Sequence, residues 1–287
     1  MAEILDVVLK ISIIVFMVGN MAGMGVQLAM AEALAALRNV RFIVMAVVWG
    51  WVLCPSFAYL LVKIIPIEQP YAIGLILLGM TPCAPFMPVM VRKARGDLSY
   101  TGAIMLLAAI GTVAFMPFAV PRMVSGLTAD AWVVGRPLLF FVLMPLSLGM
   151  AVRRYAESVA SRFYPLIKKT TDITTMVMLA VMAIVYGKDF VGAIGSYAIG
   201  TLVLFVGVVT LATDRLGFGL KQEQRSVLTI GMCTRNLGAA IAPLMTMKAD
   251  PRSVVMVALG IPVTLAFSFL AARWYARYAP QDEPAGQ

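Results

Sequence analysis

The sequence predicts an all-α polytopic membrane protein, and three observations lead to this fold class. Of the 287 residues, 61% are apolar, only 13% are charged, and the apolar residues group into long runs. The charged share is about half of that in soluble domains, so a water-soluble protein would lack polar surface. These observations exclude a soluble enzyme, a secreted disulfide-rich protein and a disordered chain. A single membrane domain covering 1–287 is expected.

Nine apolar segments are long enough to cross the hydrocarbon core, which requires roughly 20 residues in a helix. They are 4–31, 40–65, 70–94, 98–121, 132–154, 163–187, 190–213, 221–247 and 252–276. The residues that follow, 277–287, are polar and are expected to form a cytoplasmic tail.

Basic residues indicate how these nine segments are oriented. With the N-terminus outside and the C-terminus in the cytoplasm, fifteen Lys and Arg residues fall on the inner side and seven on the outer side. Such an excess of inner basic residues is the usual signal of membrane orientation. It also accounts for the net charge of +9 without a nucleic-acid partner. Arg235 is the one basic residue that this topology does not place near either membrane face.

Two of the nine segments are expected to be broken helices. The third contains prolines at 82, 85 and 88, and the eighth contains Gly231-Met-Cys-Thr-Arg-Asn-Leu-Gly238. Proline removes a backbone donor and clashes with the preceding helical turn. The two segments run in opposite directions and lie five spans apart, which predicts inverted repeats over 4–121 and 163–276 with 132–154 as the connecting span. Broken helices at matching positions are typical of the binding site of a transporter. Proline kinks in a packed bundle are the alternative.

Arg235 is the most informative residue of the second break. A guanidinium near the middle of the bilayer is costly unless it is paired. It is interpreted either as a structural counter-ion, with Asp172 as the candidate partner, or as a fixed cation for a substrate carboxylate. Asn236 can donate and accept hydrogen bonds to a polar part of a ligand. Asn20 and Gln27 either face the same cavity or bond to a neighbouring helix. The nearby glycines 19, 23 and 25 indicate close helix packing.

The chain offers few groups for catalysis. It contains no histidine, and its three cysteines lie in apolar runs. Intramembrane hydrolysis would need a nucleophile with a base or a metal cluster. The protein is therefore expected not to be an enzyme, and neither a metal site nor a bound cofactor is expected.

The residues around the two breaks resemble those of the bile acid:sodium symporter family, over about 4–276. The resemblance rests on Pro82 through Ala94-Arg95-Gly96-Asp97, and on Gly231-Met232 with Asn236 and the small residues after it. It implies a panel domain and a core domain in which the broken helices cross. It also implies a substrate cavity between the two domains and alternating access.

The sequence departs from the family at the positions that the resemblance implies for sodium. A Ser-Asn pair of sodium-coupled members falls on Met87 and Pro88, and a Glu and a Gln fall near Thr229 and Cys233. Sodium is a hard cation that prefers oxygen ligands, which most of these side chains lack. Arg235 is a candidate replacement for the positive charge of the ion.

The sequence thus predicts a secondary active transporter of a small organic anion, a carboxylate, in a bacterial inner (plasma) membrane. The resemblance implies sodium symport, whereas the departures from the family also leave uniport, exchange and proton-linked transport open. Alternatives are an arsenite-type exporter, with Cys83 as the functional thiol, and a membrane receptor that binds the anion without transporting it. The predicted substrate-binding residues are Arg235, Asn236, Thr234, Cys233, Thr81, Pro82, Cys83 and Asn20. The predicted ion-binding residues are Thr229, Thr101 and Asp172.

Overall fold

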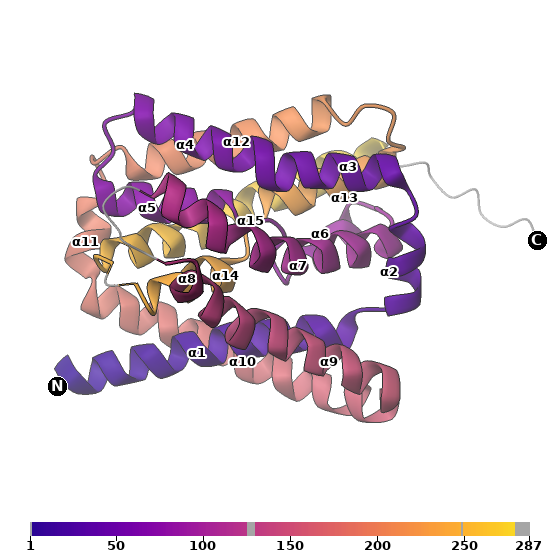
Figure 1. Ribbon diagram of the computed structural model, residues 1–287, viewed down its shortest axis with the longest axis horizontal. Coiled ribbons are helices and arrows are strands. Elements are labelled where there is room, and N and C mark those ends of the chain that lie inside the picture. Colours follow the sequence, from indigo (N-terminus) through magenta and orange to yellow (C-terminus); the bar gives the residue numbers. More distant parts are fainter. Residues whose placement is uncertain (1, 125–129, 248, 279–287) are drawn as a thin grey trace, which may run out of the picture.

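The computed structural model describes residues 2–124, 130–247 and 249–278, and the elements in these ranges are helices (Figure 1). Their one extended pairing is an isolated antiparallel bridge between Pro82 and Arg235. The all-α fold class is therefore confirmed. The predicted cytoplasmic tail lies outside the described residues from 279 onward.

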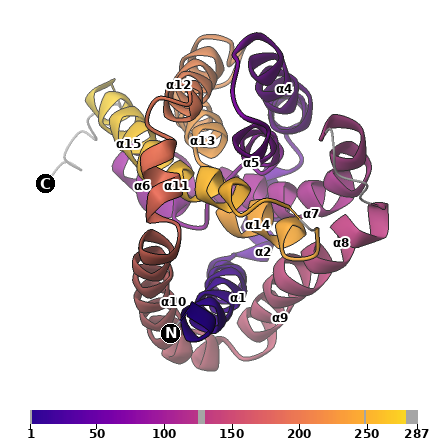
Figure 2. The same cartoon turned by 90° about the vertical axis from the view of Figure 1, so that its left-hand side faces the viewer.

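Three helices form one side of the bundle, which we call the panel (Figure 2). They are α1 (Ala2–Gln27), α9 (Met144–Tyr155) and α10 (Glu157–Val185). Helix α1 packs along both of the others, and glycines allow the close approach. A Cβ atom on Gly25 would lie 2.3 Å from the carbonyl oxygen of Leu146, and one on Gly19 would lie 2.2 Å from Thr171 Oγ1. The expected close packing at these two glycines is confirmed.

The other side of the bundle, the core, contains the broken helices. Its elements are α3 (Val40–Val47), the π-helix η1 (Val48–Leu53), α4 (Cys54–Ile64), α5 (Gln69–Gly79), α6 (Met87–Lys93), α7 (Leu98–Met123), α12 (Ala198–Arg215), α13 (Gln222–Cys233), α14 (Leu237–Leu244) and α15 (Arg252–Tyr278). The connecting elements are α2 (Met30–Ala36), α8 (Ala131–Leu138), the π-helix η2 (Leu139–Leu143) and α11 (Gly187–Gly192). In Figure 2, α4, α5, α12 and α13 gather on the side opposite α1 and α10.

Six helical segments of the described residues are long and apolar enough to cross a membrane. They correspond to the predicted spans that begin at 4, 40, 98, 132, 190 and 252. The other three predicted spans differ in a physically simple way. Helix α10 is long, but its first half is polar, whereas the spans 70–94 and 221–247 each consist of two half-helices. A helix of 7 to 12 residues is too short to cross the hydrocarbon core alone.

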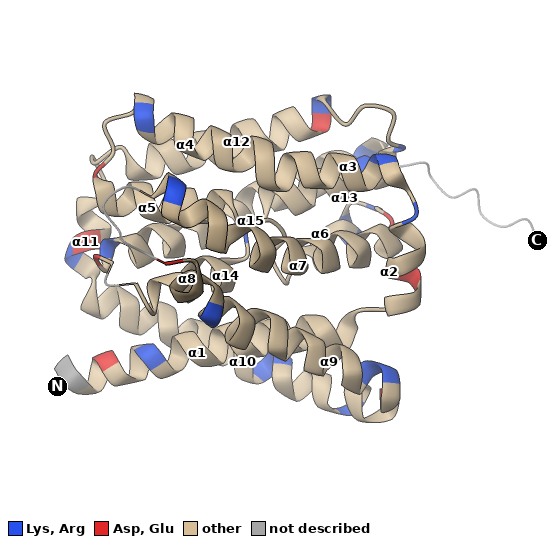
Figure 3. Ribbon diagram, viewed as in Figure 1, with Lys and Arg blue, Asp and Glu red and all other residues tan. Residues whose placement is uncertain are grey.

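Charged residues lie mainly at the two ends of the bundle (Figure 3). Lys and Arg gather most densely at the end where α9 finishes and where α3 and α13 begin. The long apolar middle between the ends is what a bilayer-spanning protein requires.

Candidate functional site

The first break separates α5, which ends at Gly79, from α6, which begins at Met87. The prolines that predicted this break lie within it or directly after it. Between them, Cys83 adopts a positive φ of 65°. This left-handed conformation is uncommon for a residue with a side chain, and it turns the chain sharply inside the protein.

The second break is shorter and contains no proline. Helix α13 ends at Cys233, α14 begins at Leu237, and both Thr234 and Asn236 have extended backbone angles. The side chain of Asn236 accepts a hydrogen bond from the backbone N–H of Ala239 at 3.1 Å. This N-cap satisfies one of the donors that every helix start leaves free.

The two breaks cross and bind each other through their main chains. The N–H of Cys83 donates to the carbonyl oxygens of Gly231 at 2.9 Å and Thr234 at 3.1 Å, and the N–H of Asn236 donates to Thr81 O at 2.8 Å. The N–H of Ala84 donates to Thr234 Oγ1 at 3.2 Å. Backbone groups that the interrupted helices leave free are thus satisfied inside the protein, as the bilayer interior requires. The expected crossing of two broken helices is present.

The two threonines of the crossing play matching local roles. Thr81 Oγ1 donates to Leu77 O at 3.2 Å, and Thr234 Oγ1 donates to Ile230 O at 2.7 Å. Each hydroxyl therefore binds the last turn of the half-helix that precedes it. Both side chains are fully buried, as are those of Cys83 and Cys233.

Arg235 and Asn236 point in opposite directions because neighbouring residues of an extended segment alternate. Asn236 faces the panel, where its Nδ2 lies 3.7 Å from Met21 Sδ on α1. Arg235 enters the core and is 0% exposed. Its Nη1 donates to Gly79 O at 3.5 Å and its Nη2 to Cys54 Sγ at 3.3 Å. Its Cζ lies 4.9 Å from the ring centre of Phe205, while its Nε has no acceptor in the described residues.

Asp172 is not the counter-ion of Arg235. It pairs with Lys168 one helical turn away on α10, and both side chains are more than half exposed. The pairing as a counter-ion, which the sequence left open, is therefore wrong. It fails because α10 belongs to the panel, whereas the guanidinium is buried on the far side of the crossing.

A crevice separates the panel from the first break and from α6. One part of it is a cavity of about 140 Å³, lined by Asn20 and Gln27 from α1, by Pro85 and Phe86 from the first break, and by Lys168 from α10. Asn20 Nδ2 donates to Phe16 O of its own helix at 2.8 Å, which leaves its amide oxygen available. Of the predicted substrate-binding residues, Asn20 lines this cavity and Arg235 does not.

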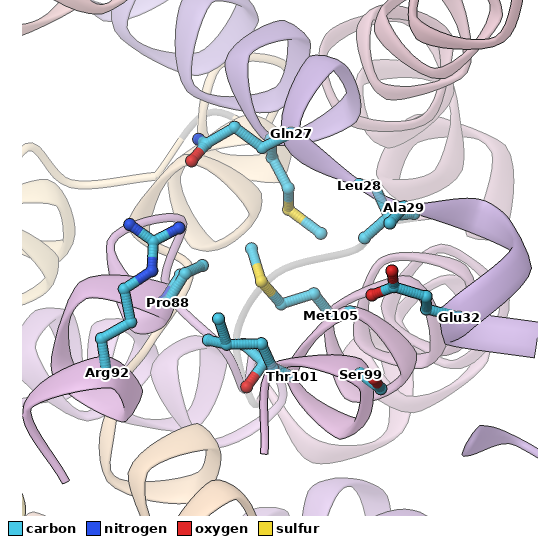
Figure 4. Close-up of a pocket in the computed structure, with 12 residues that line it drawn as sticks. Gln27, Leu28, Ala29, Glu32, Pro88, Arg92, Ser99, Thr101 and Met105 are labelled. Atoms are coloured by element: carbon cyan, nitrogen blue, oxygen red, sulfur yellow. The ribbon is translucent and has the colours of Figure 1, made fainter. Parts of the chain in front are cut away.

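A second cavity of about 170 Å³ continues the crevice toward α7 and shares Met24, Gln27 and Pro88 with the first. Figure 4 shows Arg92 and Glu32 on opposite sides of this cavity. Both cavities lie below the roughly 300 Å³ that pockets for drug-sized ligands reach, which favours a small ligand.

The predicted ion-binding residues do not form one site. Thr229 bonds to Tyr275 of α15 at 3.0 Å, away from the crevice. Thr101 bonds back to Asp97 O at 2.9 Å beside the second cavity, and Asp172 lines the first cavity from α10. In the described ranges, no three His, Cys, Asp or Glu side chains are placed to hold a metal ion. At the positions that the resemblance implies for sodium, Met87 is a buried thioether and Cys233 Sγ donates to Ile230 O. These side chains do not fit an oxygen-lined sodium site.

Sequence reasoning missed several residues of the site. Cys54 and Phe205 contact Arg235 from helices far away in the sequence, and no local pattern indicated this. Arg92 and Lys168 were counted only as inner basic residues. The signals that pointed to this region were the two amide side chains of the first span, Asn20 and Gln27, both of which line the crevice.

Comparisons with known proteins agree with this architecture. The profile of the Sodium Bile acid symporter family matches residues 13–193. A "probable sodium/metabolite cotransporter BASS3, chloroplastic" from Arabidopsis thaliana is 22% identical over 79% of this chain and 53% of its own length. A second Arabidopsis thaliana protein, a "probable sodium/metabolite cotransporter BASS1, chloroplastic", is 24% identical over 92% of this chain and 66% of its own length. The chain thus spans between about half and two thirds of these relatives. It is an integral membrane protein that belongs to the Sodium Bile acid symporter family of transporters.

Proposed function

We propose that this protein is a secondary active transporter that moves a small organic carboxylate by alternating access. In this proposal the panel and the core move relative to each other, and the substrate occupies the crevice between them. The names of the Arabidopsis relatives, which describe sodium/metabolite cotransporters, support transport of a metabolite.

The observation that carries the proposal is the crossing of two broken helices beside a polar crevice. Broken helices that cross inside a membrane protein are costly in backbone hydrogen bonds, and they occur where they line a cavity. The crevice offers amide groups from Asn20 and Gln27 and cations from Lys168 and Arg92. Lys168 is paired with Asp172, whereas Arg92 makes no ion pair in the described residues. Arg92 is therefore the cation that we assign to the substrate carboxylate.

The proposal includes a membrane topology. We propose nine spans, with each pair of half-helices serving as one span and α10 as another, and with the N-terminus outside. The half-helices α5 and α13 both end near a Gly-Met pair, Gly79-Met80 and Gly231-Met232, which supports inverted repeats. The basic end of the bundle would then lie in the cytoplasm of a bacterial cell (Figure 3).

The test is uptake of labelled small mono- and dicarboxylates by the purified protein in liposomes. Saturable uptake of at least one carboxylate is expected. Asn20→Leu and Arg92→Gln should raise KM, whereas Asn39→Ala, at the start of α3 and outside the crevice, should not. Binding of a carboxylate without flux would instead indicate a receptor. Arsenite efflux that is lost in Cys83→Ser, without carboxylate uptake, would indicate the arsenite-type exporter.

A further inference from the structure

Arg235 carries a permanent positive charge into the centre of the core. Its side chain is fully buried, and no carboxylate of the described residues pairs with it. A buried charge of this kind persists only where other groups offset its loss of water. The contacts of the guanidinium show which groups do so here.

The first such group is the end of the half-helix α5. The carbonyl oxygen of Gly79, the last residue of α5, accepts a hydrogen bond from Arg235 Nη1. The C-terminal end of a helix carries a partial negative charge, so it attracts a cation even without a carboxylate. Arg235 thereby ties the second break to the half-helix that precedes the first.

The second group is the aromatic face of Phe205 on α12, which lies 4.9 Å from Arg235 Cζ and stacks on Phe57 of α4. A desolvated guanidinium over an aromatic ring is stabilised by the ring quadrupole. Cys54 Sγ adds a weak acceptor from α4. The cation is therefore held by α4, α5 and α12, on the side of the crossing that faces away from the crevice.

We propose that Arg235 is a built-in cation of the crossing that takes over the electrostatic role of a coupling ion. Two observations support this. The carbonyl and threonine oxygens of the crossing are already engaged in hydrogen bonds within the protein. A guanidinium also already offsets the negative end of α5. The protein then holds its two broken helices together without sodium. Its carboxylate transport is also independent of sodium, a part of the inference that rests on the proposed function.

The first experiment measures thermal unfolding of the purified protein in sodium, potassium and choline chloride at one ionic strength. An ion that binds only the folded state raises the unfolding temperature, and the rise grows with the logarithm of the ion concentration above its dissociation constant. We expect the same unfolding temperature in all three salts and no change when sodium is titrated. A rise in unfolding temperature that is specific to sodium and grows with its concentration would overturn the inference, whatever the protein transports.

The second experiment removes the charge. Arg235→Ala should unfold at a lower temperature than the wild type, and guanidinium ion at millimolar concentration should restore part of the loss. Arg38→Ala, which removes an exposed arginine, should show no such rescue. Arg235→Lys keeps the charge and should remain closer to the wild type than Arg235→Gln does. Wild-type stability of Arg235→Gln, in any of the salts, would contradict the inference.

Uptake assays complete the test. Wild-type uptake in sodium and in potassium should agree within about twofold. Arg235→Gln should lower the uptake rate by about tenfold or more, which corresponds to about 1.4 kcal/mol in the activation free energy of transport. Uptake that requires sodium would overturn the inference. If the wild type moves no carboxylate in either salt, the proposed function fails, and the unfolding measurements still decide the role of Arg235.

Discussion

The two breaks interrupt their helices by different physical means. In the first break, three prolines make a continuous helix impossible, and Cys83 turns the chain with a positive φ. In the second break no residue forbids a helix, and the side chains of Thr234 and Asn236 instead satisfy backbone groups that an interruption leaves free. The first break thus arises because its prolines disrupt a continuous helix, and the second arises because side-chain hydrogen bonds favour an extended backbone. Substitutions at matching positions should therefore have different effects.

The largest difference is expected between the glycines that precede the breaks. A Cβ atom on Gly79 would lie 2.8 Å from the Cβ of Ala58, which cannot turn away. A Cβ on Gly231 would lie 3.1 Å from Cys83 Sγ and 3.2 Å from the flexible end of Met87. Gly79→Ala should lower the free energy of unfolding by about 1–3 kcal/mol, as overpacking does, and Gly231→Ala by less.

This first comparison has a simple control on α12. A Cβ on Gly200 would meet no atom within 4 Å, so Gly200→Ala should stabilise its helix by up to about 1 kcal/mol. Chemical unfolding in detergent gives all three values. A Gly231→Ala variant that is less stable than Gly79→Ala would show that the second break is the more rigid of the two.

Replacement of the two buried cysteines by glycine should give the next largest difference in stability between the two breaks. Cys83 holds a left-handed conformation that costs roughly 1–2 kcal/mol for a residue with a side chain, whereas Cys233 ends a regular helix. Cys83→Gly should relieve that strain, because glycine adopts a positive φ without steric cost, while Cys233→Gly should weaken its helix by about 0.5–1 kcal/mol. Both variants lose one buried thiol, so Cys83→Gly should be the more stable by about 2 kcal/mol. Equal unfolding temperatures would mean that the conformation of Cys83 is not strained.

The cap of the second break should have a smaller effect. Asn236→Ala removes the acceptor for the N–H of Ala239 and should cost about 1 kcal/mol. Asn39 caps α3 in the same way, accepting from the N–H of Phe42 at 3.2 Å, so Asn39→Ala should cost a similar amount. Only Asn236→Ala should also reduce carboxylate uptake, because only Asn236 faces the panel. Equal uptake in both variants would argue that Asn236 acts as a cap alone.

The smallest effect concerns the ion pairs at the starts of α5 and α15, away from both breaks. Arg252 binds Asp250 at 2.9 Å and Glu68 at 2.6 Å, and its hydrogen bond lowers the pKa of Asp250. Because the folded pKa lies below the unfolded value of about 4, this stabilisation is present above pH 4 and is lost as the pH falls through the folded pKa. Asp250→Asn should flatten the decline in unfolding temperature on the acid side slightly. An unchanged decline would show that the ion pair adds nothing measurable.

Most of the fold followed from local sequence. Apolar runs located the long helices because a bilayer-spanning helix needs about 20 apolar residues. The predicted bounds of 40–65 and 98–121 lie within two residues of those of the helical segment Val40–Ile64 and of α7. The prolines at 82, 85 and 88 predicted the first break because each removes a backbone donor and clashes with the preceding helical turn, wherever the segment lies in the fold. The second break was also found, since Gly231 and the polar residues after it are unusual within an apolar span.

Only the tertiary structure decided where the side chains of the second break point. The sequence showed a charged residue and an amide side by side, and it left Arg235 open to a carboxylate partner, a substrate or the role of an ion. The crossing holds this segment extended, so Arg235 enters the core and Asn236 faces the panel. Gly79, Cys54 and Phe205, which surround the guanidinium, are 156, 181 and 30 residues away along the chain. Sequence determines which groups must be buried, but their partners are set by the packing of distant helices, which no local pattern encodes.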